Sequence, residues 1–418
     1  MTPAFTDIGT KLGGPSGIQE LMQDLGEALT SHPDMRMLGG GNPAAVPAMQ
    51  ALWRKRIAEL LDEGGTLDRA LGNYDPPGGN PQFRELFAEF LRANCGWDVS
   101  AKNVVVMPGG QAAFFYLYTL LAGRNGSQKK KILFPITPEY IGYANQTLDP
   151  DCFAAVRPII EARPGNTFKY RIDFDRLKIT DDIAAICLSC PTNPTGNVIG
   201  GDELAALRKL AAHHGIPLML DQAYGMPFPG AIYVDWSSVW DENTIVSISL
   251  SKLGLPGTRT SVIVAREEIT TALANMNAVV ALANGNVGQA ILKPLLQGGE
   301  LIRLSREVIR PFYHERCQAA AGVLHERLSG KADYALHVSE GAFFLWLWLK
   351  KLPITSAELY QRLKRRKVLV VPGHYFFFGL DEPWEHQHQC LRLTYSQDPA
   401  IVCEGLEIIA DEVISLWK

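Results

Sequence analysis

The amino-acid sequence predicts an α/β fold, in which a large domain has a mostly parallel central sheet flanked by helices and a smaller domain is α+β. Short apolar runs typical of buried strands alternate with amphipathic runs typical of helices, and this alternation favours βαβ units and a parallel sheet. The length of 418 residues exceeds what one hydrophobic core usually supports. We therefore expect a large domain over residues 51–299 and a small domain built from residues 1–50 and 300–418.

The large domain begins with a helix pattern at 81–93, where apolar side chains recur at helical spacing between charged ones. A strand pattern at 103–107 then passes through Pro108-Gly109-Gly110 into a helix pattern at 111–121, an arrangement typical of anion sites. The remaining elements expected in this domain are strands at 131–134, 183–189, 217–220 and 244–248 and a helix at 203–213. For the small domain the sequence predicts an irregular loop at 38–43, a long helix at 300–328 and strands at 342–349 and 368–371.

Composition indicates an ordinary globular protein and argues against several classes of function. Hydrophobic residues at 47% and charged residues at 20% are inconsistent with a disordered chain. Forty basic and 44 acidic residues give a net charge of −4 without a basic block, so neither nucleic acid nor a membrane surface is an expected partner. The chain shows no signal-peptide pattern and its seven scattered cysteines are an odd number, so we expect reduced thiols and a cytoplasmic location. No cluster at ligand spacing predicts a metal site.

Lys252 is the most informative residue of the chain, because it follows an apolar strand pattern in a turn of small, apolar and hydroxylic residues. Partial burial there would lower the pKa of its amine below the usual value of about 10.4, and a neutral amine can attack an aldehyde. Arg259, past a Pro-Gly turn, offers a charged planar group suited to phosphate, and Ser249 offers a hydroxyl. The alternative is a strand-end lysine beside an unrelated surface arginine.

Further polar side chains stand at other predicted strand ends, where an open α/β sheet binds its ligand. Asp221 ends one strand and is followed by Tyr224; a carboxylate there could keep a pyridine nitrogen protonated, although it could equally cap a helix. Asn193 lies in a loop stiffened by prolines, from which its amide could reach a ring hydroxyl and a substrate carboxylate. Tyr140 could lie flat on the ring, although a lone aromatic residue is more often part of the core.

These motifs, Asn193-Pro194-Thr195-Gly196, Asp221 with Tyr224, and the run from Ser249 to Arg259, occur in the order and spacing of the class I/II aminotransferases. The chain resembles that family over nearly its full length. The resemblance implies the fold type I architecture, pyridoxal 5'-phosphate as cofactor, and a homodimer with active sites at its interface. It also implies small amino acids and 2-oxo acids as substrates.

The resemblance further implies a role for each matching residue. Lys252 would bond the cofactor and carry a proton, Asp221 would partner the ring nitrogen, and Asn193 and Tyr224 would contact the ring oxygen. The residues expected at the cofactor phosphate are Gly110, Gln111, Ser249, Arg259 and, from the other subunit, Tyr74. One departure is Gly109-Gly110, where relatives often have a serine or asparagine before the glutamine, so backbone amides would do more of the phosphate binding.

Arg392 matches the arginine that binds the substrate α-carboxylate in this family, and Gly41 matches the N-terminal position that closes over the substrate. From the residues alone, Arg392 could also be a strand residue with an ion-pair partner. Segments such as 37–44, 138–143, 250–257 and 341–348 resemble the members that transfer the amino group of L-valine to pyruvate. That reaction is our expectation; a broader alanine or aliphatic aminotransferase and a C–S β-lyase on the same scaffold remain alternatives. A cofactor-binding regulator would need a DNA-binding domain, for which the sequence gives no pattern.

Overall fold

The computed structural model describes residues 4–32 and 34–417. Its central sheet is eight-stranded and mostly parallel, in the order β2-β11-β10-β9-β8-β4-β3 with β5 beside β4. β11 runs antiparallel to both of its neighbours, β10 and β2, and β3 runs antiparallel to β4. The strands are β2 Val104–Met107, β3 Gly123–Asn125, β4 Gln128–Phe134, β5 Phe153–Ala155, β8 Ile183–Ser189, β9 Leu218–Asp221, β10 Thr244–Ser249 and β11 Ser261–Val264. The predicted α/β fold is therefore confirmed.

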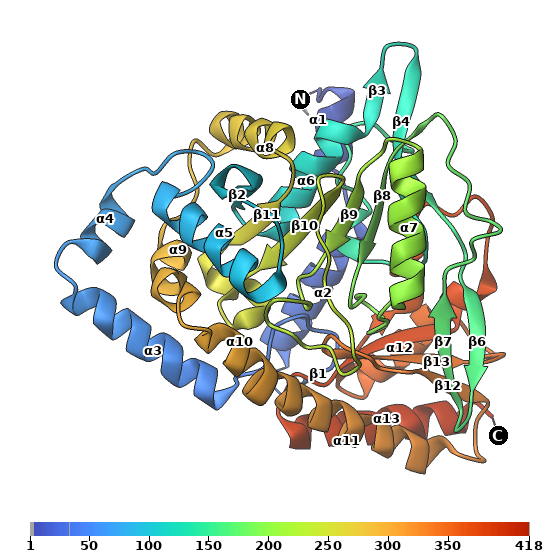
Figure 1. The fold of residues 1–418 in the computed structure, drawn as a ribbon. Coiled ribbons are helices and arrows are strands. Elements are labelled where there is room, and N and C mark those ends of the chain that lie inside the picture. Colours follow the sequence, from blue (N-terminus) through green and yellow to red (C-terminus); the bar gives the residue numbers. More distant parts are fainter. Residues whose placement is uncertain (1–3, 33, 418) are drawn as a thin grey trace.

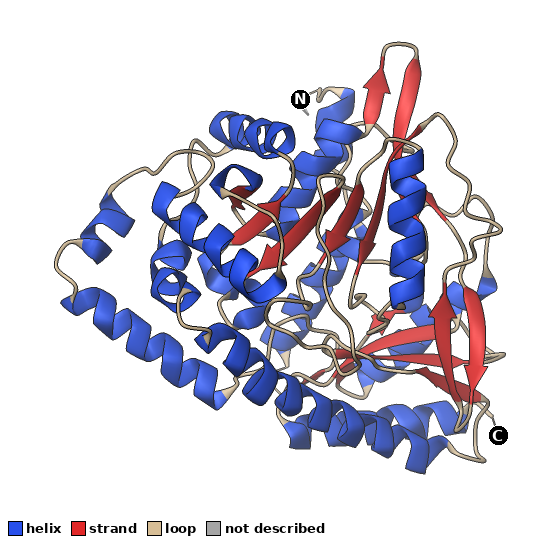
Figure 2. Cartoon of the chain, viewed as in Figure 1, coloured by secondary structure: helices blue, strands red, loops and turns tan. Residues whose placement is uncertain are grey.

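Helices cover both faces of this sheet (Figures 1 and 2). Side chains of β2 alternate between the two faces, so Val104 and Val106 pack in one apolar cluster while Val105 and Met107 pack in the other. The first cluster contains α5 Pro81–Cys95 and α7 Gly201–His213, and the second contains α6 Gly110–Leu121 and α8 Glu267–Val280. Burial on both faces explains why the central strands β2, β8, β9 and β11 are mostly apolar, whereas β3 and the start of β4 are polar and exposed.

A second sheet, of six strands in the order β15-β16-β13-β12-β7-β6, lies beside the first. Its later strands are β12 Tyr334–His337, β13 Phe344–Leu349, β15 Val371–Pro372 and β16 Cys390–Thr394. The hairpin of β6 Ile159–Arg163 and β7 Thr167–Arg171 comes from the middle of the chain and pairs with β12. The proposed domain limits at 51–299 and 300–418 stay a prediction, and this hairpin crosses them.

The N-terminal segment joins the later half of the chain, because β1 Arg36–Met37 pairs in parallel with β14 Val368–Leu369. The predicted strand at 368–371 is in fact two short strands, β14 and β15, that belong to different sheets. Two helices before the glycine-rich loop, α1 Asp7–Gly13 and α2 Gly17–Ser31, were not predicted. Both begin at capping side chains, Thr6 and Ser16, whose oxygens accept backbone hydrogen bonds.

The predicted helix at 300–328 is interrupted. It consists of α10 Glu300–Leu304, a π-helical turn at Ser305–Ile309, and α11 Arg310–Leu328. Pro311 has no backbone N–H to donate to the preceding turn, which explains why the regular hydrogen-bond ladder changes there. The other helices are α3 Pro47–Asp62, α4 Thr66–Gly72, α9 Val287–Leu292, α12 Ser356–Arg365 and α13 Pro399–Ser415.

Within the described part of the chain, no helix combines the length and the apolar character needed to cross a membrane. The same residues contain no group of three His, Cys, Asp or Glu side chains placed to hold a metal ion. Cys187 and Cys190 are fully buried free thiols on or next to β8, as expected of cysteines that serve packing.

Candidate active site

Polar residues at the ends of three neighbouring strands lie at one edge of the central sheet, and two of them, Asp221 and Ser249, are predicted site residues. Ser189, Asp221 and Ser249 are the last residues of β8, β9 and β10, and the register pairs Ser189 with Asp221 directly. Because these strands are parallel, their carboxyl ends meet at the same edge (Figure 1). The sheet thus brings polar groups together from positions far apart in the sequence.

Lys252 lies in the 3-10 turn Ser251–Leu253 that follows β10. Its Nζ donates a hydrogen bond of 2.6 Å to the carbonyl oxygen of Gly41 and lies 5.3 Å from the ring centre of Tyr224. Burial, and next the positive charge of Arg392, lower the pKa of Lys252 to about 8, while Asp221 opposes the shift. The amine therefore has an accessible neutral form near physiological pH, as the sequence predicted.

Asp221 has a partner that the sequence did not indicate. The phenol of Tyr143 donates a hydrogen bond to Oδ2 of Asp221, and the Ala223 N–H donates to Oδ1 at 3.0 Å. Burial raises the pKa of the carboxyl group, and the bond from Tyr143 is the largest opposing effect. Tyr143 is fully buried in an aromatic cluster, so its sequence context resembles that of any core tyrosine. No local signal distinguished it.

A concave surface of glycine and arginine adjoins the start of α6. Gly109 has φ +88°, and a Cβ built there would lie 2.2 Å from Nη2 of Arg259. Arg259 is exposed, and its Nη1 bonds only weakly, at 3.2 Å to the Pro256 carbonyl and at 3.4 Å to the Ser251 hydroxyl. Gly110 begins the helix, where backbone N–H groups are free to bind an anion. The arrangement suits a phosphate group.

Gln111 uses its side chain differently from the predicted phosphate contact. Its Nε2 donates to the Gly142 carbonyl at 2.9 Å, and its Oε1 accepts from the Tyr140 hydroxyl at 3.3 Å. The side-chain amide therefore holds the loop that carries Tyr140. Only the backbone N–H of Gln111, in the first turn of α6, remains suited to an anion.

Arg392, in the middle of β16, reaches the same edge from the second sheet. Its Nη1 donates to Oδ1 of Asn193 at 2.9 Å, and its Nη2 donates to the Gly39 carbonyl at 2.7 Å. Its guanidinium carbon lies 4.3 Å from the ring centre of Phe344, and burial lowers its pKa to about 10. Among the described residues no carboxylate forms an ion pair with it, so the alternative of a structural ion pair is wrong. The charge is therefore available to an incoming anion.

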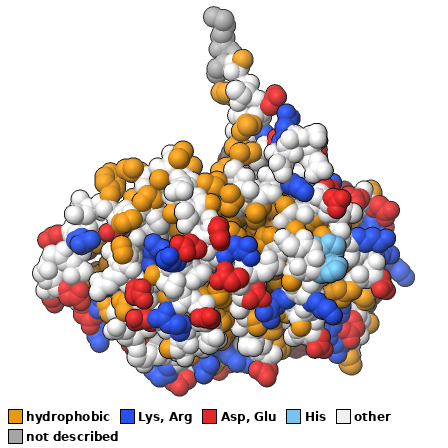
Figure 3. Space-filling model, turned by 45° about the horizontal axis from the view of Figure 1, so that its top comes forward, with side chains coloured by type: hydrophobic (Ala, Val, Ile, Leu, Met, Phe, Trp, Pro, Cys, Tyr) orange, Lys and Arg blue, Asp and Glu red, His pale blue; other side chains and the backbone are white. Residues whose placement is uncertain are grey.

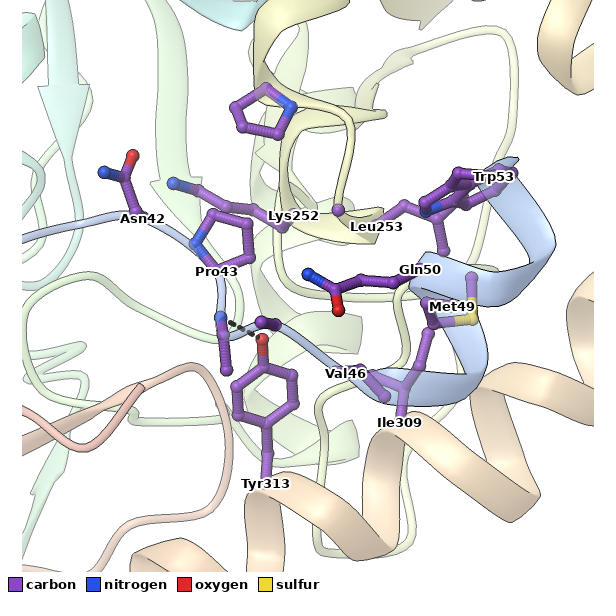
Figure 4. Close-up of a pocket in the computed structure, with 14 residues that line it drawn as sticks. Asn42, Pro43, Val46, Met49, Gln50, Trp53, Lys252, Leu253, Ile309 and Tyr313 are labelled. Carbon is purple, nitrogen blue, oxygen red and sulfur yellow. Dashed lines mark hydrogen bonds between the residues drawn. The ribbon is translucent and has the colours of Figure 1, made fainter. Parts of the chain in front are cut away.

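A cavity of about 190 Å³ opens beside Lys252. Figure 4 shows it between the loop after Asn42, the start of α3, and Tyr313 on α11. The backbone N–H of Ala44 donates to the Tyr313 hydroxyl at 2.8 Å, which fixes that loop against the helix. Most of the lining is apolar, including Val46, Met49 and Ile309.

Comparisons with known proteins agree with this geometry. Residues 53–409 match the model of the family "Aminotransferase class I and II". The chain belongs to the class I and II aminotransferases. It is 47% identical over 414 residues to the valine–pyruvate aminotransferase of Escherichia coli K12, and the match covers 99% of each protein.

Two solved structures of aminotransferases are similar along nearly the whole chain. The valine–pyruvate aminotransferase of Salmonella typhimurium LT2 is 46% identical, with a TM-score of 0.88 and coverage of 96% of this chain and 99% of that one. An aminotransferase structure from Psychrobacter arcticum 273-4 is 40% identical, with a TM-score of 0.96 and coverage of 99% of both chains.

Aminotransferases of this family depend on pyridoxal 5'-phosphate, and the residues present fit that group. The missing side chain at Gly109 lets the guanidinium of Arg259 lie against the start of α6, where both can face a phosphate, while Lys252 offers an amine and Asp221 a half-buried carboxyl group. Tyr140, whose ring is half-buried beside Gln111, stands at the same edge. Tyr74 is different: it follows α4, and its side chain is 83% exposed.

Proposed function

We propose that this aminotransferase moves the amino group of L-valine to pyruvate, which gives 3-methyl-2-oxobutanoate and L-alanine. The observation that carries the proposal is the 47% identity to a valine–pyruvate aminotransferase along 99% of both chains. The mostly apolar cavity beside Lys252 supports it, because an aliphatic side chain needs a site without fixed charge.

We assign the cofactor contacts as follows. Lys252 bonds the cofactor, and the groups that hold its phosphate are Arg259, Ser249 and the N–H groups of Gly110 and Gln111. Asp221 would pair with the ring nitrogen, Asn193 and Tyr224 would bind the ring oxygen, and Tyr140 would pack on the ring. The bound cofactor supplies a protonated ring that spreads the negative charge left on the substrate Cα.

The protein's own groups then move one proton. With the cofactor bound, the Lys252 amine would accept the proton from the substrate Cα as a base and then donate it as an acid. Its lowered pKa of about 8 suits both tasks. Burial raises the pKa of Asp221, and the hydrogen bonds from Tyr143 and Ala223 oppose that shift and favour the ionised form, which is the form that would keep a ring nitrogen protonated.

Substrate orientation falls to Arg392, Asn193 and Gly41. The guanidinium of Arg392 already bonds Asn193 and the Gly39 carbonyl, so both partners are placed at the position of the α-carboxylate. The Gly41 carbonyl accepts from Lys252, which puts the N-terminal loop directly over the reacting amine. A carboxylate bound at Arg392 would therefore hold the substrate Cα within reach of that amine.

The test is the absorbance of the purified enzyme before and after addition of L-valine, and then of pyruvate. The visible band should shift to the amine form of the cofactor with valine and return with pyruvate. If only alanine or another amino acid shifts the band, a broader aminotransferase is indicated. Release of pyruvate and ammonia from cystathionine without an amino acceptor would indicate a C–S lyase. Absence of any band with added cofactor would contradict the whole assignment.

We further propose a homodimer, in which the partner's copy of Tyr74 reaches the phosphate site. Large apolar side chains gather around Tyr74: Leu71 is 68%, Val279 87%, Val280 64% and Leu282 58% exposed. Their segments are joined, since Asn286 bonds the Asn73 carbonyl and Asn284 the Pro77 carbonyl. Such a patch is typical of a protein interface.

The N-terminal segment that includes α1 adds to this support, because it projects from the body of the molecule (Figure 3). Phe5, before the helix, and Ile8 and Leu12, in it, are exposed. Sedimentation equilibrium would test the dimer, and Tyr74→Phe should weaken cofactor affinity; unchanged affinity would rule out the role of Tyr74. The cytoplasm remains the proposed location, which cell fractionation would test.

A further inference from the structure

Glu139 is a buried acid that no part of the proposed mechanism uses. Its side chain is 1% exposed, in the loop at 135–140 between β4 and the 3-10 turn Ile141–Tyr143. Among the described residues it forms no ion pair with a cation. Burial raises its pKa to about 8, although two hydrogen bonds from Ser189 oppose the shift. A buried acid without a neighbouring cation destabilises a fold relative to an apolar side chain, because the acid loses its hydration on burial.

The acid instead completes the edge of the central sheet. Oε2 of Glu139 accepts the backbone N–H of Ser189 at 2.7 Å, and Oε1 accepts the Ser189 hydroxyl. Successive N–H groups of a strand point to opposite sides, and the next one, from Cys190, bonds the Asp221 carbonyl on the β9 side. On the other side β4 pairs with β8 only as far as Ile186. Beyond Ile186, β4 offers no acceptor to β8, and Glu139 supplies one for the Ser189 N–H.

The same residue also contacts the second sheet region. The backbone N–H of Glu139 donates to the Phe376 carbonyl at 2.9 Å, and the Phe376 ring centre lies 5.3 Å from the guanidinium carbon of Arg392. Glu139 thus touches three segments: it precedes Tyr140, it binds the strand end that leads into the loop of Asn193, and it bonds the neighbour of Arg392.

We propose that Glu139 is a positioning residue, which fastens the loop of Tyr140 to the end of β8 and so sets Tyr140 against the loop of Asn193. An apolar residue would fill the junction but would leave the Ser189 N–H unpaired and the loop free to shift. The inference rests on the proposed roles of Tyr140 and Asn193, not on valine as substrate. Its test uses whichever amino acid converts the bound cofactor.

The experiment compares the holoenzymes of wild type, Glu139→Ala, Glu139→Gln, Ser189→Ala and the double variant of Ala at both positions. The readouts are kcat and KM of the amino-acid half-reaction, the circular dichroism of the bound cofactor, and the melting temperature. In Glu139→Ala, kcat should fall about tenfold or more and the cofactor signal should change, as for a misplaced reacting group. Glu139→Gln should recover most of kcat, since its amide oxygen can still accept the Ser189 N–H.

Coupling between the two residues gives a second, independent criterion. Ser189→Ala removes only the hydroxyl contact, which Glu139→Ala removes as well, so the double variant should lose no more activity than Glu139→Ala alone. A control is Glu203→Gln: this half-buried acid, which also pairs with Arg171, likewise accepts backbone N–H groups, from Gly200 at 2.8 Å and Ile172 at 2.9 Å, but on α7 away from the site. Its kcat should equal that of wild type.

Three results would overturn the proposal. One is a wild-type kcat and cofactor signal in Glu139→Ala with only a lower melting temperature, which would make the residue merely structural. Another is an equal loss in Glu139→Gln and Glu139→Ala, which would make charge rather than placement decisive. The third is additive loss in the double variant. If Glu139→Ala does not fold, Glu139→Gln and Ser189→Ala decide the matter: near-wild-type kcat in Glu139→Gln with a reduced kcat in Ser189→Ala supports the proposal, and any other combination overturns it.

Discussion

Tyr143→Phe removes one hydroxyl group from the centre of the protein and nothing else. That hydroxyl donates to Oδ2 of Asp221, the carboxyl group assigned to the cofactor ring nitrogen. The ring itself packs against Phe114 with centroids 4.8 Å apart, and phenylalanine can keep this contact. The substitution therefore tests one hydrogen bond without opening a large cavity.

The size of the effect follows from what remains around Asp221. A hydrogen bond to a charged group contributes about 1.5–3 kcal/mol, which corresponds to roughly 10- to 100-fold. The Ala223 N–H still donates at 3.0 Å and Lys252 still attracts the carboxylate, so we expect the lower part of that range. Because burial already raises the pKa of Asp221, loss of the donor raises it further. When the pH is lowered, Asp221 in the variant therefore loses its charge at a higher pH than in the wild type.

The assay is the rate of the valine half-reaction, followed by cofactor absorbance in stopped flow from pH 5 to 10. For Tyr143→Phe we expect kcat to fall about tenfold with little change in KM, and the acidic limb of the pH profile to move upward. Tyr118→Phe is the matched control, since its hydroxyl lies in the same buried cluster but faces the Cys187 sulfur at 3.4 Å. Identical pH profiles for Tyr143→Phe and wild type would refute the link between Tyr143 and Asp221.

Three further predictions concern the rest of the site. Because the pKa of Lys252 is lowered to about 8, the rate of cofactor uptake by the cofactor-free protein should rise with pH, with its midpoint near pH 8, and level off above it. A rate still rising at pH 10 in stopped flow would contradict this. Arg392→Lys replaces a planar donor of two hydrogen bonds by a point charge, so the KM of both substrates in steady-state kinetics should rise about 10- to 100-fold. An unchanged KM would contradict the role of Arg392. Gly109→Ala strains the backbone at φ +88° and crowds Arg259, so the dissociation constant of the cofactor in equilibrium dialysis should rise about tenfold. Gly96→Ala, at an exposed glycine with φ +68°, is the control and should bind the cofactor as the wild type does.

Much of the fold was predictable because strand and helix patterns are local. The alternation of apolar strands with amphipathic helices predicted the doubly covered sheet, and β8, β9 and β10 lie within a few residues of the predicted bounds. Polar residues at strand ends predicted where the site would form, since parallel strands bring their carboxyl ends to one edge. Antiparallel β11 and the hairpin β6–β7 were not predicted, and their places in the sheets depend on second partners that are distant in sequence, β2 and β12.

The sequence by itself determined the α/β class, the edge at which the site lies, and the residue types found there, since each depends on local periodicity and on the chemistry of single side chains. Tertiary structure alone decided how those residues are held. Tyr143 meets Asp221 across 78 positions, Glu139 meets Ser189 across 50, and Arg392 meets Gly39 across 353. Such contacts leave no local pattern, because they arise only when separate segments dock and buried polar groups must find partners there.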